Sequence, residues 1–122
     1  MNGPILLVED DEPLRKTIAR HLRAGGREVL EADSAEDALE QLASGVAPSL
    51  VILDINLPGE TGWDLLRSEV LRAAGDPPVV VATVTGIRPR KLREFGVAGY
   101  LPKPFPLDTL MATVQRLTGD SE

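Results

Sequence analysis

The chain of 122 residues contains no cysteine, and this absence removes several classes of site. It has no disulfide framework, no thiolate nucleophile and no cysteine-ligated zinc or iron–sulfur centre. Histidine occurs once, as His21, and a single histidine without partners is assigned to the surface or to packing. The 11 glycines form no GxGxxG or Walker sequence, which disfavours nucleotide binding.

Basic residues and long apolar runs are also scarce. The chain has 13 Lys and Arg against 19 Asp and Glu, so its formal net charge is −6. Direct nucleic-acid binding is not expected, because it needs a basic face that displaces counterions. No apolar run approaches the roughly 20 residues of a membrane span, and the acidic run at 9–12 comes too early for a signal peptide. We therefore expect a soluble, cytoplasmic, single-domain protein over residues 1–122, without membrane contact.

Two patterns of apolar residues alternate along the chain, short unbroken runs and stretches with helical spacing. Short β-branched runs at 5–8, 50–53 and 79–82 predict strands buried on both faces, and weaker runs at 29–30 and 100–101 predict two more. Stretches with helical features lie between and after them, near 14–22, 35–42, 65–70, 88–95 and 107–117. Strand and helix thus alternate five times, which predicts an α/β fold with a parallel sheet and helices on both faces. We expect the tail at 118–122 to fray.

Polar residues follow the predicted strands where each strand ends. They are Glu9 and Asp10 after the first run, Asp54 after the third, Thr83 after the fourth and Lys103 after the fifth. The carboxyl ends of parallel strands meet at one edge of the sheet, so these groups should converge. Crowded carboxylates need a counter-charge, and a set of oxygen ligands favours Mg²⁺. A carboxylate between a metal and a lysine is suited to accept a phosphoryl group as an acyl phosphate.

Four segments carry a resemblance to a known family: ILLVEDDE at 5–12, LVILDINLPGETG at 50–62, VVVAT at 79–83 and GYLPKPF at 99–105. Together they resemble the receiver domain of bacterial two-component response regulators. The resemblance implies a flavodoxin-like, doubly wound sheet of five parallel strands in the order 2-1-3-4-5. It also implies a signalling switch rather than an enzyme, with only self-catalysed phosphotransfer and slow autodephosphorylation.

The resemblance further implies partners and a metal site. A sensor histidine kinase or a phosphotransfer protein would phosphorylate Asp54. Asp10 and Asp54 would ligate Mg²⁺ directly, Glu9 would act through water, and Asn56 would supply its backbone carbonyl. The signal would pass to an output protein through the face formed by the helix near 88–95, the last strand and the last helix.

The resemblance also assigns the switch. Lys103 and Thr83 would contact the phosphoryl group, and the peptide bond between Lys103 and Pro104 would be cis, which aims the lysine at the site. Thr83 and Tyr100 would move together on phosphorylation. Two alternatives stay open: Thr85 in place of Thr83, and Tyr100 as a packed core aromatic.

Two departures from the family pattern affect the region after Thr83. The spacing from Thr83 to Lys103 is two residues shorter than the family's, so we expect the helix near 88–95 to be short or reoriented. Val84 stands where a small residue is usual, and we expect it to narrow access to Asp54. The basic stretch at 88–93 is interpreted as a solvated helix face or as a contact for an acidic partner.

Other functions remain open at this point. Asp54 could merely cap a turn, and the chain could be a receiver-like interaction module that works without phosphorylation. A Mg²⁺-dependent aspartyl-phosphate phosphatase commonly has an aspartate two residues after the nucleophile as general acid, but that position is Asn56. A flavodoxin-type flavin module would need phosphate-binding residues after the first strand, where Glu9 and Asp10 would repel an anion.

Overall fold

The structure is a computed structural model that describes residues 3–59 and 61–119. Along the chain the elements are β1 (Ile5–Val8), α1 (Glu12–Ala24), β2 (Val29–Ala32), α2 (Ala35–Ala43), β3 (Leu50–Leu53), α3 (Gly62–Arg67), α4 (Glu69–Ala73), β4 (Val79–Thr83), α5 (Pro89–Glu94), β5 (Gly99–Pro102) and α6 (Leu107–Thr118). The predicted alternation of strand and helix is confirmed. The α5 helix has only six residues, as the short spacing before Lys103 predicts.

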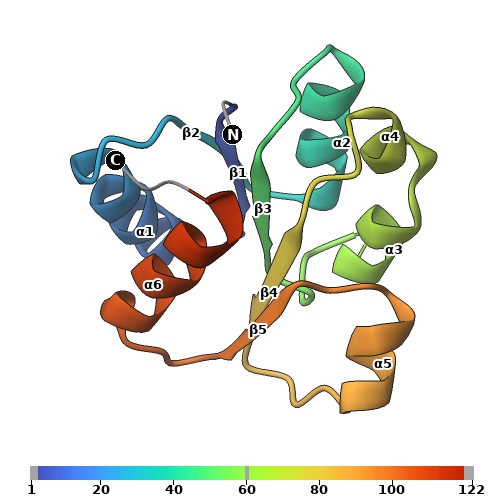
Figure 1. The fold of residues 1–122 in the computed structure, drawn as a ribbon. Helices are drawn as coiled ribbons and strands as arrows, with labels where there is room; N and C mark the ends of the chain where they lie inside the picture. Colours follow the sequence, from blue (N-terminus) through green and yellow to red (C-terminus); the bar gives the residue numbers. More distant parts are fainter. Residues whose placement is uncertain (1–2, 60, 120–122) are drawn as a thin grey trace.

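The five strands form one parallel sheet in the order β2-β1-β3-β4-β5, which confirms the predicted flavodoxin-like topology. Helices α1 and α6 lie on one side of this sheet, and α2, α3, α4 and α5 lie on the other (Figure 1). The unbroken apolar runs follow from this layering, because alternate residues enter different cores. In β1, Leu6 and Val8 belong to the core under α2, whereas Ile5 and Leu7 belong to the core under α1 and α6.

One predicted helix is interrupted in the structure. The apolar positions near 65–70 suggest a single helix, but Ser68 is extended, with φ −73° and ψ 137°. Its side chain accepts a hydrogen bond from the backbone N–H of Val70 and so caps a new helix, α4. The prediction of one helix here is wrong, because a serine N-cap followed by Glu69 competes with continued helix.

The predicted fraying of the tail is wrong at Thr118. This residue is the last of α6 and is buried. Its hydroxyl donates a hydrogen bond to the carbonyl of Val114 and accepts one from Nη1 of Arg27, at 2.8 and 2.7 Å. Residues 120–122 of the predicted frayed tail lie outside the described residues. None of the helices described in 3–59 and 61–119 is both long and apolar enough to cross a membrane.

Candidate functional site

Three carboxylates meet where β1 and β3 end. Glu9 and Asp10 follow β1, Asp54 follows β3, and one oxygen from each side chain lies within 4.8 Å of the others. Glu9 and Asp54 are buried, with exposed fractions of 3% and 6%, whereas Asp10 is exposed. The three acids therefore form a small group of oxygen ligands that solvent reaches at Asp10.

Lys103 joins two of these acids. Its Nζ atom lies 2.6 Å from Oε1 of Glu9 and 3.1 Å from Oδ2 of Asp54. The residue follows β5, its backbone N–H donates to the carbonyl of Thr83, and its peptide bond with Pro104 is cis, in agreement with the sequence-based expectation. We call Glu9, Asp10, Asp54 and Lys103 the Asp54 cluster; in it one positive charge faces three carboxylates.

Burial and the hydrogen bonds of Lys103 shift two pKa values within the Asp54 cluster. Burial raises the pKa of Glu9 from 4.5 to about 7, even though hydrogen bonds from Lys103 and from the backbone N–H of Asp11 lower it. Burial alone would lower the pKa of Lys103, but its hydrogen bonds with Glu9 and Asp54 outweigh burial and raise that pKa above 10.5. Three carboxylates share one lysine here, so a bound cation would offset the remaining negative charge, and carboxylate oxygens are the donors that Mg²⁺ prefers.

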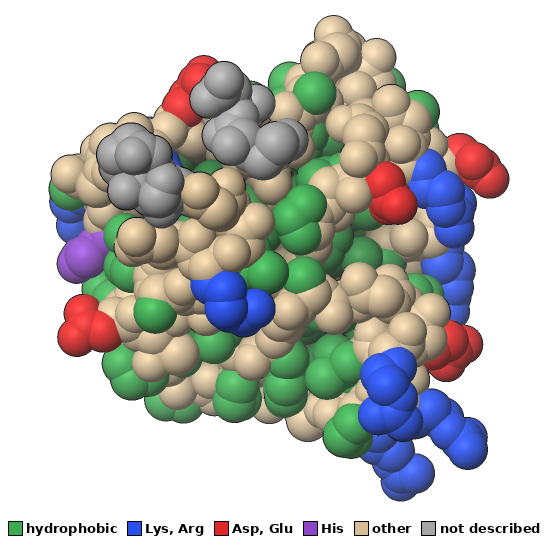
Figure 2. All heavy atoms as spheres, in the orientation of Figure 1, with side chains coloured by type: hydrophobic (Ala, Val, Ile, Leu, Met, Phe, Trp, Pro, Cys, Tyr) green, Lys and Arg blue, Asp and Glu red, His purple; other side chains and the backbone are tan. Residues whose placement is uncertain are grey.

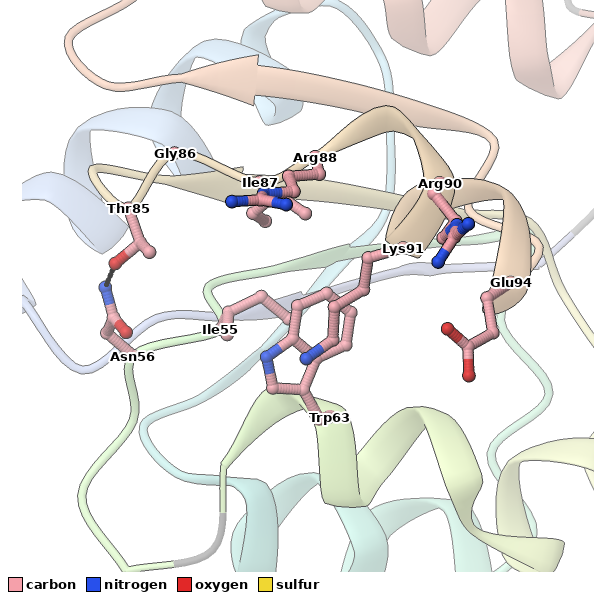
Figure 3. Close-up of a pocket in the computed structure, with 10 residues that line it drawn as sticks. All are labelled: Ile55, Asn56, Trp63, Thr85, Gly86, Ile87, Arg88, Arg90, Lys91 and Glu94. Carbon is pink, nitrogen blue, oxygen red and sulfur yellow. Dashed lines mark hydrogen bonds between the residues drawn. The ribbon is translucent and has the colours of Figure 1, made fainter.

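Asn56 connects Asp54 to Thr83, the last residue of β4, and to Thr85 in the loop after it. Its backbone N–H donates to Oδ1 of Asp54 at 3.0 Å. Its side-chain Nδ2 donates to Oγ1 of Thr83 at 3.1 Å. It also donates to Oγ1 of Thr85 at 2.5 Å (Figure 3). The sequence-based assignment gave Asn56 only a backbone role and missed these side-chain contacts. The partners are 27 and 29 positions away, and no local pattern indicates such a contact.

The two residues assigned to the switch are linked through Thr85. Thr83 is fully buried at the end of β4, and its hydroxyl also accepts from the backbone N–H of Thr85 at 3.4 Å. The hydroxyl of Tyr100 donates to the carbonyl of Thr85 at 3.1 Å. Tyr100 is half-buried against the core under α2, so a packing role accompanies this hydrogen bond.

Val84 is 72% exposed. It lines a recess of about 410 Å³ together with Lys103, Pro104 and Leu14. The narrowing of access to Asp54 by Val84 stays a prediction.

A second group of charged residues lies beside the Asp54 cluster and escaped the sequence analysis. Glu31 on β2 contacts Arg15, Lys16 and Arg23 of α1, at 3.0, 3.2 and 3.1 Å. We call these four residues the Glu31 cluster. Burial acts to raise the pKa of Glu31, but the hydrogen bonds from the three cations outweigh it and lower the pKa below 4.5. Arg15 also donates from Nη1 to the backbone carbonyl of Glu9 at 2.9 Å. This hydrogen bond helps to position the backbone at the Asp54 cluster.

Known proteins are similar to this chain in sequence and in fold. Residues 5–115 match the family model of the response regulator receiver domain. The chain is 42% identical over 118 residues to the response regulator protein FleR of Pseudomonas aeruginosa, and this match covers 95% of the chain and 24% of FleR. It is 32% identical to the non-phosphorylated HemR receiver domain from Leptospira biflexa, with a TM-score of 0.84 over 99% of this chain and 98% of that one.

A further solved structure is the response regulator protein TrrA from Thermotoga maritima in complex with Mg²⁺-BeF. It is 29% identical, with a TM-score of 0.81 over 95% of this chain and 99% of that one. The chain spans about half or less of the length of the curated relatives that it matches.

The chain belongs to the response regulator receiver domain family of two-component signalling. Receiver domains are phosphoacceptor signalling modules rather than enzymes, and membership implies a cognate histidine kinase as partner. The phosphatase and flavin-binding alternatives are therefore set aside.

Proposed function

We propose that this chain is a phosphorylation-activated switch that accepts a phosphoryl group on Asp54 from a phosphohistidine of a sensor kinase or of a phosphotransfer protein. The observation that carries the proposal is how the Asp54 carboxylate is held. One oxygen accepts from the backbone N–H of Asn56 and the other from Nζ of Lys103, at 3.0 and 3.1 Å. Other contacts hold both of these hydrogen-bond donors in place. The carboxylate is therefore positioned before a phosphorylated partner protein binds.

The chemistry needs few groups. An oxygen of the Asp54 carboxylate attacks phosphorus, the bond between phosphorus and the donor imidazole nitrogen breaks, and its electron pair returns to the ring. The product is an acyl phosphate. A carboxylate nucleophile has no proton to lose, so no general base is required. The raised pKa keeps Lys103 charged beside the carboxylate, where it can offset the charge of the phosphoryl oxygens.

The metal part of the proposal uses the same residues. Asp10, Asp54 and the backbone carbonyl of Asn56 would hold Mg²⁺ directly, and Glu9 would hold it through water. When bound, Mg²⁺ supplies positive charge that offsets the carboxylates and the phosphoryl oxygens. Support comes from the grouping of the three acids and from TrrA, whose similar fold was solved with Mg²⁺-BeF.

The switch would work by exchange of hydrogen bonds at Thr83. Its hydroxyl accepts from Asn56 and from the N–H of Thr85 in the structure. A phosphoryl group on Asp54 would attract that hydroxyl as a donor, and the contacts with Asn56 and Thr85 would then have to rearrange. Tyr100 is hydrogen-bonded to Thr85, so the change would reach β5 and the face formed by α5, β5 and α6.

The test is labelling by acetyl phosphate in the presence of Mg²⁺, followed by intact-protein mass spectrometry. We expect one phosphoryl group on the wild-type chain and none on Asp54→Asn. Asp108→Asn, the same substitution at an exposed position in the first turn of α6, is the matched control and should label as wild type. Equal labelling of wild type and Asp54→Asn would refute Asp54 as the acceptor. No labelling of any form would favour the phosphorylation-independent module.

A further inference from the structure

A recess of about 450 Å³ lies between α3 and α5, next to the Asp54 cluster but outside it (Figure 3). Its half-buried apolar residues include Trp63 and Ile87, and exposed cations stand around them, namely Arg88, Arg90 and Lys91. Glu94 is the one acid among the lining residues. A concave apolar surface with a few charged groups around it is the usual form of a binding site.

The charge around this recess is opposite to that of the chain. Residues 84–98 contain four cations and one acid, whereas the whole chain has a net charge of −6. Figure 2 shows Lys and Arg side chains projecting together at the lower right, where Figure 1 places α5. Within the described part of the chain, Arg88 and Arg90 form no ion pair. Their charge is therefore available to an acidic partner.

The ring of Trp63 already has two neighbours. Nζ of Lys91 lies over the indole, 4.5 Å from its centroid, and the ring of Phe95 lies 4.7 Å away at 38°. A planar base could stack on the face that Lys91 covers only by displacing the ammonium group, so this face of the indole is poorly suited to a nucleotide base. The apolar space that remains suits an aliphatic or aromatic side chain.

The placement of the arginines also favours a peptide over one compact anion. In Figure 3 the guanidinium groups of Arg88 and Arg90 lie on different sides of the recess rather than converging on one point. Carboxylates spread along an extended or helical segment could reach both, whereas a single phosphate could not. Buried apolar anchors with charged groups at the rim are the common arrangement of protein–protein contacts.

We propose that the recess between α3 and α5 docks an acidic segment of a partner protein, with an apolar side chain of that segment against Trp63 and Ile87 and flanking carboxylates on Arg88 and Arg90. The inference goes beyond the proposed function and does not depend on it. It is therefore tested in the unphosphorylated protein, without Mg²⁺ and without acetyl phosphate.

The test measures binding of the blocked peptide DELLEE, with the peptide KRLLKK and ATP as competing probes. Trp63 is the only tryptophan, so its fluorescence reports on the recess, and anisotropy of a labelled peptide gives a second readout. We expect saturable binding of DELLEE that weakens with salt. The double variant Arg88→Glu/Arg90→Glu should lose at least about tenfold in affinity.

The matched control is Arg20→Glu/Arg116→Glu, which makes the same charge change at exposed positions of α1 and α6 on the other side of the sheet. It should bind DELLEE as wild type does, and circular dichroism should show both double variants folded. Equal loss in the two double variants would reduce the effect to net charge and overturn the proposal. Tighter binding of ATP or of KRLLKK, or no binding of DELLEE at millimolar concentration, would also overturn it.

Discussion

Two groups of charged side chains have opposite balances of charge, one after the strands β1, β3 and β5 and the other between β2 and α1. In the Asp54 cluster one lysine faces three carboxylates, and in the Glu31 cluster three cations surround one carboxylate. The pKa values shift in opposite directions: burial outweighs the hydrogen bond from Lys103 and raises the pKa of Glu9 to about 7, whereas the three cations outweigh burial and lower the pKa of Glu31. A carboxylate with satisfied partners indicates a structural role. Three carboxylates that share a single lysine indicate a site for a further cation.

The two clusters are also joined. Arg15 donates from Nε to Glu31 and from Nη1 to the backbone carbonyl of Glu9, at 3.0 and 2.9 Å. Arg15 of the Glu31 cluster thus positions the backbone at Glu9 of the Asp54 cluster. Arg15 therefore links the two clusters, whereas substitutions at Lys16 and Lys103 each act on one cluster alone.

The largest expected effect comes from removing the single cation of the Asp54 cluster. Lys103→Gln leaves Glu9 and Asp54 buried without a positive partner, and we expect a loss of about 3 kcal/mol in the free energy of unfolding at pH 8 without Mg²⁺. The loss should be smaller at pH 5.5, because Glu9 then takes up a proton. Urea-induced unfolding measures both values.

The control is Lys16→Gln in the Glu31 cluster. Lys16 is half exposed, and two arginines remain on Glu31, so we expect a loss below about 0.5 kcal/mol. Similar losses in the two variants would contradict the contrast between the clusters.

A smaller effect is expected from Glu31→Gln. The carboxylate accepts hydrogen bonds from two arginines on α1, and we expect its loss to cost about 1–2 kcal/mol. Since the folded pKa of Glu31 is lowered, its contribution is present above the unfolded value near 4.5 and is lost as the pH falls through the folded value. The difference between wild type and variant should therefore shrink below about pH 4.5. A difference that grows on acidification would show that the sign is wrong.

A smaller effect than that of Glu31→Gln is expected from Arg15→Lys, which keeps the charge but loses the planar guanidinium group that joins the clusters. We expect a loss of about 1 kcal/mol or less in stability and no more than about a tenfold loss of Mg²⁺ affinity. Calorimetric titration with Mg²⁺ measures the affinity, and urea-induced unfolding measures the stability. Arg20→Lys on the exposed face of α1 is the matched control and should change neither.

Much of the fold follows from local sequence. The unbroken apolar runs at 5–8, 50–53 and 79–82 predict central strands because only a sheet covered on both faces buries them completely. The break at Ser68 had a local signal as well, a serine followed by Glu69, but the apolar spacing around it suggested a continuous helix. No local signal in the sequence indicated the burial of Thr118, because its hydrogen-bond partner Arg27 is 91 positions away.

The candidate site also has a part that the sequence predicts and a part that it does not. The strands can be assigned from the sequence, and the carboxyl ends of parallel strands lie at one edge of the sheet. The meeting of residues at the ends of β1, β3, β4 and β5 could therefore be predicted. The side-chain bonds of Asn56 and the four-residue Glu31 cluster depend instead on how long side chains reach across elements. The period of apolar residues carries no information about such contacts.

The central claim is that the excess of carboxylates around Asp54 exists to hold one divalent cation. Calorimetric titration of the unphosphorylated chain with MgCl₂ tests it most directly, with Asp10→Asn, Asp54→Asn and Glu31→Gln measured beside the wild type. We predict one Mg²⁺ per chain in wild type and in Glu31→Gln, and little or no binding in the other two variants. Undiminished binding in Asp10→Asn and Asp54→Asn, or no binding to the wild type, would contradict the account.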